Sequence, residues 1–272
     1  MLHQTSVDGR STRQKRAGFN IVIILYKIFT MKWWIGCSGF HYDHWKKLFY
    51  PEDLPKSKWF DYYKESFNTL ELNVTFYRFP RLNVLENWYK KSPAKFSFSV
   101  KIPRAITHYK QFHQTERMLA DCYSTIREGL TDKLGPVLFQ LPGRTVYTEE
   151  RLQRIVDSLD PAFNNVLELR HPSWWNEGVY QALAKHKISF CGMSHPDLPD
   201  EVVQNTPVVY YRFHGRPHLY KSPYKTPFLK KVADEIGSNK KVKQAFLYFN
   251  NDIDASAIKN ARQLQKIVAR QM

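Results

Sequence analysis

Residues 165–170 read NVLELR, an aliphatic run that is broken by one glutamate and closed by an arginine. A short run of this kind is typical of a strand buried on both faces of a parallel sheet. Residues 148–159 (TEERLQRIVDSL) before it and residues 177–186 after it carry apolar side chains at helical spacing. Thr148, which is followed by two glutamates, is typical of a helix N-cap. A strand between two helices favours a parallel sheet, because each helix returns the chain in the same direction.

This alternation extends along the chain from Met31 onward. It predicts strands at 33–37, 69–73, 96–100, 136–141, 166–169, 188–191, 208–213 and 245–249. It predicts helices at 57–67, 82–91, 115–130, 148–159, 177–186, 227–236 and 254–270. Residues 192–206 are rich in Pro and Asp and are predicted to form a loop. Eight such strands predict an α/β protein, a single (β/α)8 TIM-type barrel with parallel strands. The alternative, an open doubly wound sheet, typically has a GxGxxG motif after its first strand, and this sequence has none there.

Length and composition suit one domain of this kind. The chain has 272 residues, of which 43% are apolar, enough for a large core. Lys and Arg number 41 against 25 Asp and Glu, a formal net charge of +16. The basic residues are scattered rather than aligned along one helix, which favours a solvated basic surface. The same charge attracts polyanions, so nucleic acid stays open as a partner.

Cysteine usage indicates a reducing compartment. The three cysteines are Cys37, Cys122 and Cys191, and none belongs to a CxxC pair. This pattern argues against a disulfide framework and against a structural zinc site. We therefore expect a cytoplasmic protein, and no sequence feature identifies a protein partner.

The first part of the chain differs from the rest. Residues 1–18 are polar and basic, and residues 19–29 (FNIVIILYKIF) form an apolar run that contains one lysine. The run is too short for an ordinary membrane span, and no small-x-small cleavage site follows it. Met31 stands just before the strand-like WWIGCSGF. We expect residues 1–30 to be an extension, disordered or read from a mis-called upstream start, with no membrane association. The less favoured alternative is a membrane anchor, and the barrel domain is expected at 31–272.

Ionisable side chains recur at the carboxyl ends of the predicted strands, where a barrel builds its ligand site. Three pairs lie two residues apart, which places both members of a pair on one face of a strand: Glu71 and Asn73, Glu168 and Arg170, and Arg212 and His214. Burying a charge is costly unless it is paired. These residues therefore predict either a mutually paired network or a ligand site at the barrel mouth.

Several motifs, in order, resemble the YecE-like family, also called domain of unknown function 72. They are GCSGF, HYDHWKKLFYPEDLP, ELNVTFYRFP, FSVKIPRAITH, GPVLFQLP, LELRHPSWW, YYRFHGR and YFNND. The resemblance runs from about Trp33 to Leu264 and implies a TIM-type barrel. The loop after Gln140, LPGRTVYTEE, departs from the Pro/aromatic stretch typical of the family, so the edge of the pocket is expected to differ there.

The resemblance also implies which polar residues form the site. By position they are Glu71, Asn73, Tyr77, Lys101, His108, Gln140, Glu168, Arg170, His171, Arg212, His214, Asn250 and Asp252.

Three kinds of chemistry fit this set of side chains. Lys101, Arg170 and Arg212 are suited to binding phosphate or carboxylate, although each could instead neutralise a glutamate. Glu71 and Glu168 are suited to acid–base catalysis with the help of a histidine. A metal site is the third, because Glu71, Glu168, His214 and Asp252 are ligand types of metal-dependent barrel enzymes.

The interleaved Lys and Arg would repel a cation, so no metal and no cofactor is predicted, and a divalent metal is the less favoured alternative. A Schiff base on Lys101, a nucleophilic Cys37 and stacking of a base or sugar on Trp174 and Trp175 are less favoured still.

The sequence thus predicts an enzyme, a hydrolase or isomerase, that acts on a phosphorylated or other anionic small molecule at the C-terminal face of the barrel. Its catalytic residues would be Glu71, Glu168, Lys101 and His214, and the remaining residues of the set would bind the substrate. The alternatives are a nucleic-acid-binding or nucleic-acid-processing protein and a non-catalytic ligand-binding module.

Overall fold

Eight parallel strands close into a barrel in the computed structural model, which describes residue 1 and residues 31–271. The strands follow one another around the barrel in chain order, and the last strand pairs with the first. They are β1 (Lys32–Ser38), β2 (Thr69–Leu72), β3 (Ser97–Lys101), β4 (Leu134–Leu141), β5 (Asn165–Leu169), β6 (Ser189–Ser194), β7 (Val208–Phe213) and β8 (Gln244–Phe249). The predicted fold class is confirmed. Apart from Met1, the predicted extension lies outside the described residues.

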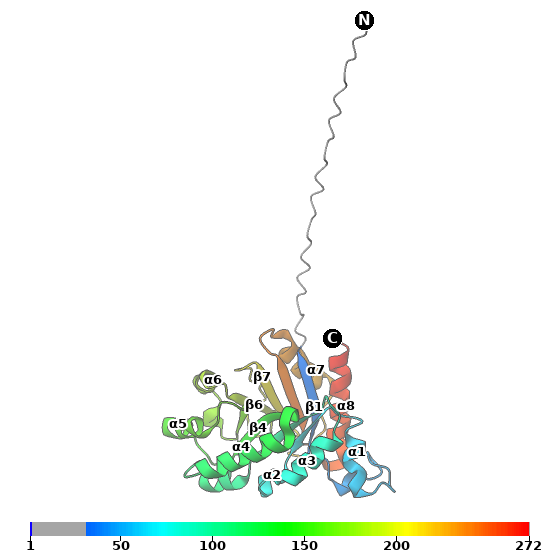
Figure 1. Ribbon diagram of the computed structural model, residues 1–272, viewed down its shortest axis with the longest axis horizontal. Coiled ribbons are helices and arrows are strands. Elements are labelled where there is room, and N and C mark those ends of the chain that lie inside the picture. The colour runs from blue at the N-terminus through cyan, green and yellow to red at the C-terminus, as the bar shows by residue number, and fades with distance from the viewer. Residues whose placement is uncertain (2–30, 272) are drawn as a thin grey trace.

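Helices surround the strands, which lie at the centre of the molecule (Figure 1). The helices are α1 (Trp59–Tyr63), α2 (Val74–Tyr77), α3 (Leu82–Lys91), α4 (Glu116–Leu130), α5 (Glu149–Ser158), α6 (Glu177–Lys185), α7 (Thr226–Ser238) and α8 (Ser256–Ala269). Shorter helical turns are η1 (Asp43–Trp45), η2 (Lys56–Lys58), η3 (Ala105–Lys110), η4 (Thr131–Lys133), η5 (Pro172–Trp174) and η6 (Ile253–Ala255). The predicted N-cap is confirmed, since the Thr148 hydroxyl accepts a hydrogen bond from the Arg151 amide at 3.2 Å.

The helix predicted at 57–67 is much shorter than expected. Only η2 and α1 form there, and the chain leaves the helix after Tyr63. The reason is the start of β2. The side chain of Asn68 donates from Nδ2 to the Trp33 carbonyl at 2.9 Å, and its Oδ1 accepts from the Ile35 backbone N–H at 3.3 Å. These two bonds hold the residue before β2 against β1, and the preceding residues must turn to reach it.

The strand predicted at 69–73 ends one residue early, at Leu72. Asn73 has helical backbone angles (φ −93°, ψ −16°) and precedes α2. It therefore does not share a strand face with Glu71 as predicted, although it stays at the same end of the barrel.

The connection between β6 and β7 contains no helix. The prediction of a loop at 192–206 is wrong for its first three residues, because β6 continues to Ser194, and right in that no helix follows. The chain instead packs directly on the barrel, burying Val202 and Val203. Gly192 permits this approach: a Cβ there would lie 2.6 Å from the Glu201 carbonyl oxygen and 3.0 Å from the Val203 amide nitrogen.

Polar side chains fill much of the barrel interior, while the outer faces of the strands pack against helices through apolar residues. The hydroxyls of Thr69 and Tyr248 are 2.6 Å apart, and those of Ser99 and Tyr210 are 2.8 Å apart. Each pair joins a tyrosine hydroxyl to an aliphatic one, and buried hydroxyls paired in this way satisfy each other's hydrogen bonds. These hydroxyl pairs lie one layer deeper in the barrel than the ionisable side chains at its mouth.

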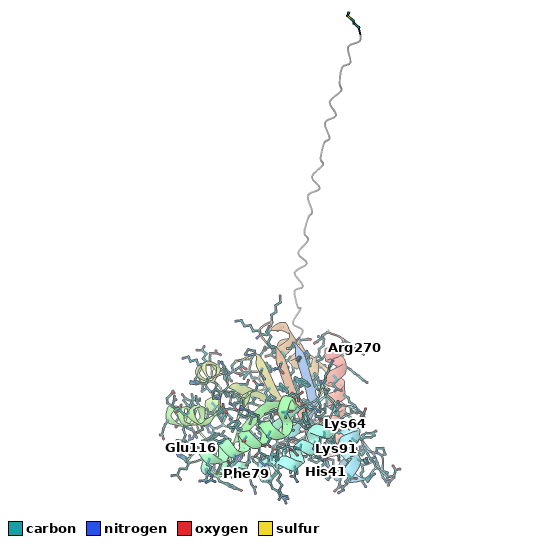
Figure 2. All side chains as sticks on the ribbon, in the orientation of Figure 1. His41, Lys64, Phe79, Lys91, Glu116 and Arg270 are labelled. Carbon is teal, nitrogen blue, oxygen red and sulfur yellow. The ribbon has the colours of Figure 1, made fainter. Side chains whose placement is uncertain are left out.

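The carboxyl ends of the strands lie at one end of the molecule. Figure 2 shows His41 and Phe79, which follow β1 and β2, at the lower edge, and Arg270, which follows α8, at the opposite end. The predicted site residues after each strand therefore face the lower edge. Within residues 31–271, no helix has the length and apolar character needed to cross a bilayer.

Candidate functional site

The deepest part of the barrel mouth is a buried ion network centred on Arg212 of β7. Arg212 Nη2 donates to Glu71 Oε1 at 2.6 Å, and Nη1 donates to Glu168 Oε2 at 2.5 Å. Arg170 Nε donates to the second oxygen of Glu168 at 2.6 Å, and the Tyr210 hydroxyl donates to the second oxygen of Glu71 at 2.6 Å. All four carboxylate oxygens thus accept a hydrogen bond, and both glutamates are fully buried.

Three strands bring these groups to one level inside the barrel. Glu71 lies on β2, Glu168 on β5 and Arg212 on β7, each near the carboxyl end of its strand. Their side chains point inward because they alternate with outward-facing apolar residues of the same strands. The guanidinium of Arg212 bonds to both carboxylates, so the network bridges the barrel interior from β2 to β5.

The charges of the network balance. Burial opposes the ionised form of Glu168, but Arg170, Arg212 and a hydrogen bond from His214 outweigh it and hold the pKa of this carboxyl well below its usual range. Burial and then Arg212 hold the pKa of His214 well below its usual value, so its imidazole is neutral. Glu71 and Glu168 stand opposite two guanidinium groups, those of Arg170 and Arg212, so the formal charges of the four side chains cancel.

Lys101 lies at the end of β3 beside this network and is 8% exposed. Its Nζ donates to Gln140 Oε1 and lies 4.1 Å from the centre of the Phe76 ring. Among the described residues it forms no ion pair with a carboxylate. Burial, reinforced by the nearby Arg212, lowers the pKa of Lys101 to about 7. This amine therefore exchanges its proton close to neutral pH.

A cavity of about 660 Å³ opens above the network at the barrel mouth. It has the size of a small-molecule site. Its lining residues are Tyr42, Asn73, Phe76, Tyr77, Lys101, Arg104, His108, Tyr109, Gln140, Arg170, Arg212, Tyr220, Asn250 and Asp252.

The structure brings most of the predicted site residues to this cavity. Those that line it are Asn73, Tyr77, Lys101, His108, Gln140, Arg170, Arg212, Asn250 and Asp252. Glu71, Glu168 and His214 lie beneath it, with side chains that are not exposed. Their catalytic and binding roles remain predictions, but the meeting of these side chains at one rim is observed.

His171 is the predicted site residue that the structure places apart. It is not among the residues that line the cavity. Its Nδ1 lies 2.8 Å from the Ser173 hydroxyl and accepts from the Ser173 amide at 3.2 Å. The side chain thus caps η5, a local structural contact that the strand-end position did not reveal.

The geometry bears on two of the predicted roles, which remain predictions. The general base expected of Glu71 or Glu168 is disfavoured, because both carboxylates are enclosed and all their oxygens are occupied. The anion clamp expected of Arg212 is also disfavoured, because both of its Nη atoms are committed to glutamates and the residue is 1% exposed. Arg170 and Lys101 are left as the cations that face the cavity from the network.

Two further ionisable residues that line the cavity, His108 and Asp252, have shifted pKa values. Burial, with Lys101 and Arg170 nearby, lowers the pKa of His108 to about 4, so this ring is neutral at pH 7. Burial raises the pKa of Asp252, whose carboxylate lies 3.4 Å from His44 Nε2.

Five lining residues were not predicted: Tyr42, Phe76, Arg104, Tyr109 and Tyr220. The Arg104 guanidinium lies 5.4 Å from the Tyr77 ring and 5.5 Å from the Tyr109 ring, at the exposed edge of the cavity. All five follow a strand within the loops that surround the mouth, and that position was the signal that could have found them.

The remaining candidates do not assemble into sites. Among residues 31–271, no three His, Cys, Asp or Glu side chains group as metal ligands, and Arg212 occupies the space between the two glutamates. Burial raises the pKa of the Cys37 thiol, which makes it a poor nucleophile. Trp174 is fully buried and donates to the Thr145 carbonyl, a core contact.

Known proteins of similar sequence and structure support the family resemblance. The family model described as "Protein of unknown function DUF72" matches residues 34–272. The protein YecE of Escherichia coli is 29% identical over 117 residues, a match that spans 43% of this chain and only 43% of YecE itself. The protein YunF of Bacillus subtilis is 24% identical over 270 residues, or 86% of this chain and 94% of YunF.

Solved structures agree with this match. The crystal structure of a DUF72 family protein from Thermotoga maritima is similar to this chain with a TM-score of 0.78 and 27% identity, covering 88% of this chain and 99% of that one. A DUF72 family protein from Enterococcus faecalis shares the fold, with a TM-score of 0.70 and 20% identity over 89% of this chain and 99% of that one. From the match over residues 34–272, the chain belongs to the DUF72 family.

Proposed function

We propose that the mouth cavity binds a small anionic molecule and that Lys101 is the acid–base group of an enzyme acting on it. The observation that supports this most strongly is the placement of Lys101: an amine at the base of the cavity, next to Arg170, without a carboxylate partner among the described residues. Barrel enzymes place their reactive groups at this face. The notable difference from the sequence prediction is that the lysine takes the role assigned there to the glutamates.

Charge balance explains why an anion fits. The formal charges of the buried network cancel, with Arg170 counted in it. Outside the network, Lys101 and Arg104 line the cavity with a single carboxylate, that of Asp252. Burial penalises the ammonium form of Lys101, and a bound anion offsets that penalty. Binding an anion is therefore coupled to proton uptake by the amine.

The acid–base role follows from the same coupling. A group whose pKa lies near the working pH is present in both forms and transfers protons efficiently in either direction. Lys101 satisfies this condition, and Gln140 with the Phe76 ring fixes the position of its Nζ. Arg170, held by Glu168, would orient the anionic group of the ligand.

Titration calorimetry with sulfate, whose charge is constant near neutral pH, tests the binding. Removing one charge-assisted contact costs about 1.5–3 kcal/mol, or about ten- to a hundredfold in affinity. We expect this loss for Lys101→Met and Arg170→Met. Lys95→Met is the matched control, because Lys95 is exposed and precedes the amino end of the same strand β3. No sulfate binding at pH 6, or equal affinity in all three variants, contradicts the proposal.

Proton uptake separates a proton-transferring lysine from a fixed charge. Calorimetry in buffers of different ionisation enthalpy should show that the wild type takes up about half a proton per sulfate at pH 7, given a pKa of about 7. Lys101→Arg should bind sulfate without this uptake, because arginine stays charged. Uptake that persists in Lys101→Arg would assign the proton to another group.

A further inference from the structure

A second cavity, of about 380 Å³, adjoins the mouth cavity. Figure 2 places His41, one of its lining residues, at the same lower edge as the strand ends. The cavity lies between the loop after β1, the start of α2 and helix α3. The side chains that matter here are Phe40, Tyr42, Asn73, Tyr77, Val84 and Trp88.

The two cavities are neighbours, since Tyr42, Asn73 and Tyr77 line both of them. They differ in chemistry. The mouth cavity is lined by Lys101 and Arg170. The second is lined mainly by aromatic and aliphatic side chains, with Glu71 and His41 as its ionisable members. Its walls include Trp88, which stacks on Phe98 of the core at 22°.

An unpartnered polar atom marks the junction. The carboxamide oxygen Oδ1 of Asn73 is buried and has no hydrogen-bond partner among the described residues. A buried acceptor without a donor is costly, and such atoms are few in native proteins. Asn73 lines both cavities, so its carboxamide stands where a ligand that spans them would pass.

The aromatic lining of the second cavity favours a flat apolar group, which can stack on rings. Its walls include the rings of Phe40 and Tyr42, both half-buried, and Val84 on the exposed side of α3. Pockets lined in this way gain binding energy from the apolar area that they remove from water.

From these observations we infer that the ligand of the mouth cavity is an amphipathic anion, in which an anionic group joins a flat apolar ring system seated against Phe40, Val84 and Trp88. This inference rests on the proposed function, since it assigns the anionic group to Lys101 and Arg170. It excludes small anions without an apolar part as the preferred ligands.

The test compares two sulfonates of equal charge. Methanesulfonate has the anionic group alone, and naphthalene-1-sulfonate adds a fused ring. We expect naphthalene-1-sulfonate to bind the full chain at least about tenfold more tightly than methanesulfonate. In Val84→Trp, which fills the second cavity, this advantage should fall below about threefold, with methanesulfonate affinity unchanged. Val146→Trp, an exposed valine in the loop after β4, is the matched control and should keep the full advantage.

The outcomes separate the two ideas. If methanesulfonate binds and naphthalene-1-sulfonate binds no better, or if the advantage survives in Val84→Trp, the inference is wrong and the proposed function stands. If neither sulfonate binds the wild type, the proposed function fails and the inference fails with it. If naphthalene-1-sulfonate binds Arg170→Met as tightly as the wild type, the ring binds without the anionic group, and the amphipathic ligand is refuted.

Discussion

Replacing Arg212 by methionine tests the buried ion network most directly. Methionine has a similar length and no charge, so the substitution leaves two buried carboxylates, Glu71 and Glu168, with one guanidinium, that of Arg170. Removing one partner from a buried ion pair costs about 3–5 kcal/mol, because the remaining charge is left uncompensated. For a domain of this size, that loss corresponds to a decrease of about 6–20 °C in Tm.

A second substitution makes this expectation specific. In the double variant Arg212→Met with Glu71→Gln, one carboxylate again faces one arginine, so the charges balance. We expect the double variant to regain at least about 1 kcal/mol relative to Arg212→Met, a coupling typical of residues in direct contact. Urea unfolding and thermal melting at pH 7 measure both values. Arg117→Met, at an exposed position of α4, is the control and should change stability by less than about 0.5 kcal/mol.

The reasoning is refuted by either of two results. A loss below about 1 kcal/mol for Arg212→Met would mean that the ions are hydrated or already uncompensated. A double variant no more stable than the single one would mean that Glu71 and Arg212 do not depend on each other.

Three further predictions follow from the site and the fold. Sulfate affinity should fall about tenfold from pH 6 to pH 8 as Lys101, with a pKa of about 7, loses its proton, and Lys101→Arg should abolish this dependence in calorimetric titrations. Between about pH 7 and the ordinary lysine pKa of 10.5, Lys101 is deprotonated in the native state and protonated in the unfolded state. The free energy of unfolding should therefore rise with pH over this range, by up to about 1.4 kcal/mol per pH unit. A flat profile in the wild type, or the same rise in Lys101→Met, would contradict this prediction. Gly192→Ala should destabilise by about 1–3 kcal/mol through the contact of its Cβ with the Glu201 carbonyl. Gly237→Ala, at an exposed position of α7 where a Cβ meets no atom closer than 3.9 Å, should be neutral or stabilising in the same melts.

Much of the fold could be predicted from alternation alone. All eight strands form where short apolar runs were found, because a strand buried on both faces needs such a run whatever its neighbours. The prediction of a helix over the whole of 57–67 was wrong. The apolar periodicity there fits a helix, but the hydrogen bonds of Asn68 to β1 end it early, and such long-range bonds leave no signal in the local sequence. The early end of β2 has the same origin, since Asn73 tolerates either conformation and the turn into α2 decides it.

The sequence predicted most of the residues that meet at the site, but not how deeply each of them is buried. Strand-end position correctly brought Glu71, Glu168 and Arg212 together, since parallel strands end at one face. Sequence could not tell which side chains face the cavity and which lie beneath it, because that depends on the stagger of the strands around the barrel. Arg212 is an example: it lines the cavity, as expected, but both of its Nη atoms are bonded to glutamates, which its position in the sequence does not reveal. Tyr42 and Tyr220 were missed because they reach the cavity from loops whose paths have no periodic pattern.

The missing helix between β6 and β7 has a consequence for native-state motion. Elsewhere around the barrel a helix protects the strand behind it with its own hydrogen-bonded backbone. Here residues 195–207 cover the wall through packed side chains and a few backbone contacts, among them the bridge between Met193 and Glu201. Segments of this kind open at a free energy below that of global unfolding. Amide hydrogens in this stretch should therefore exchange with solvent ahead of those in the other connections, and the barrel should begin to loosen from this side.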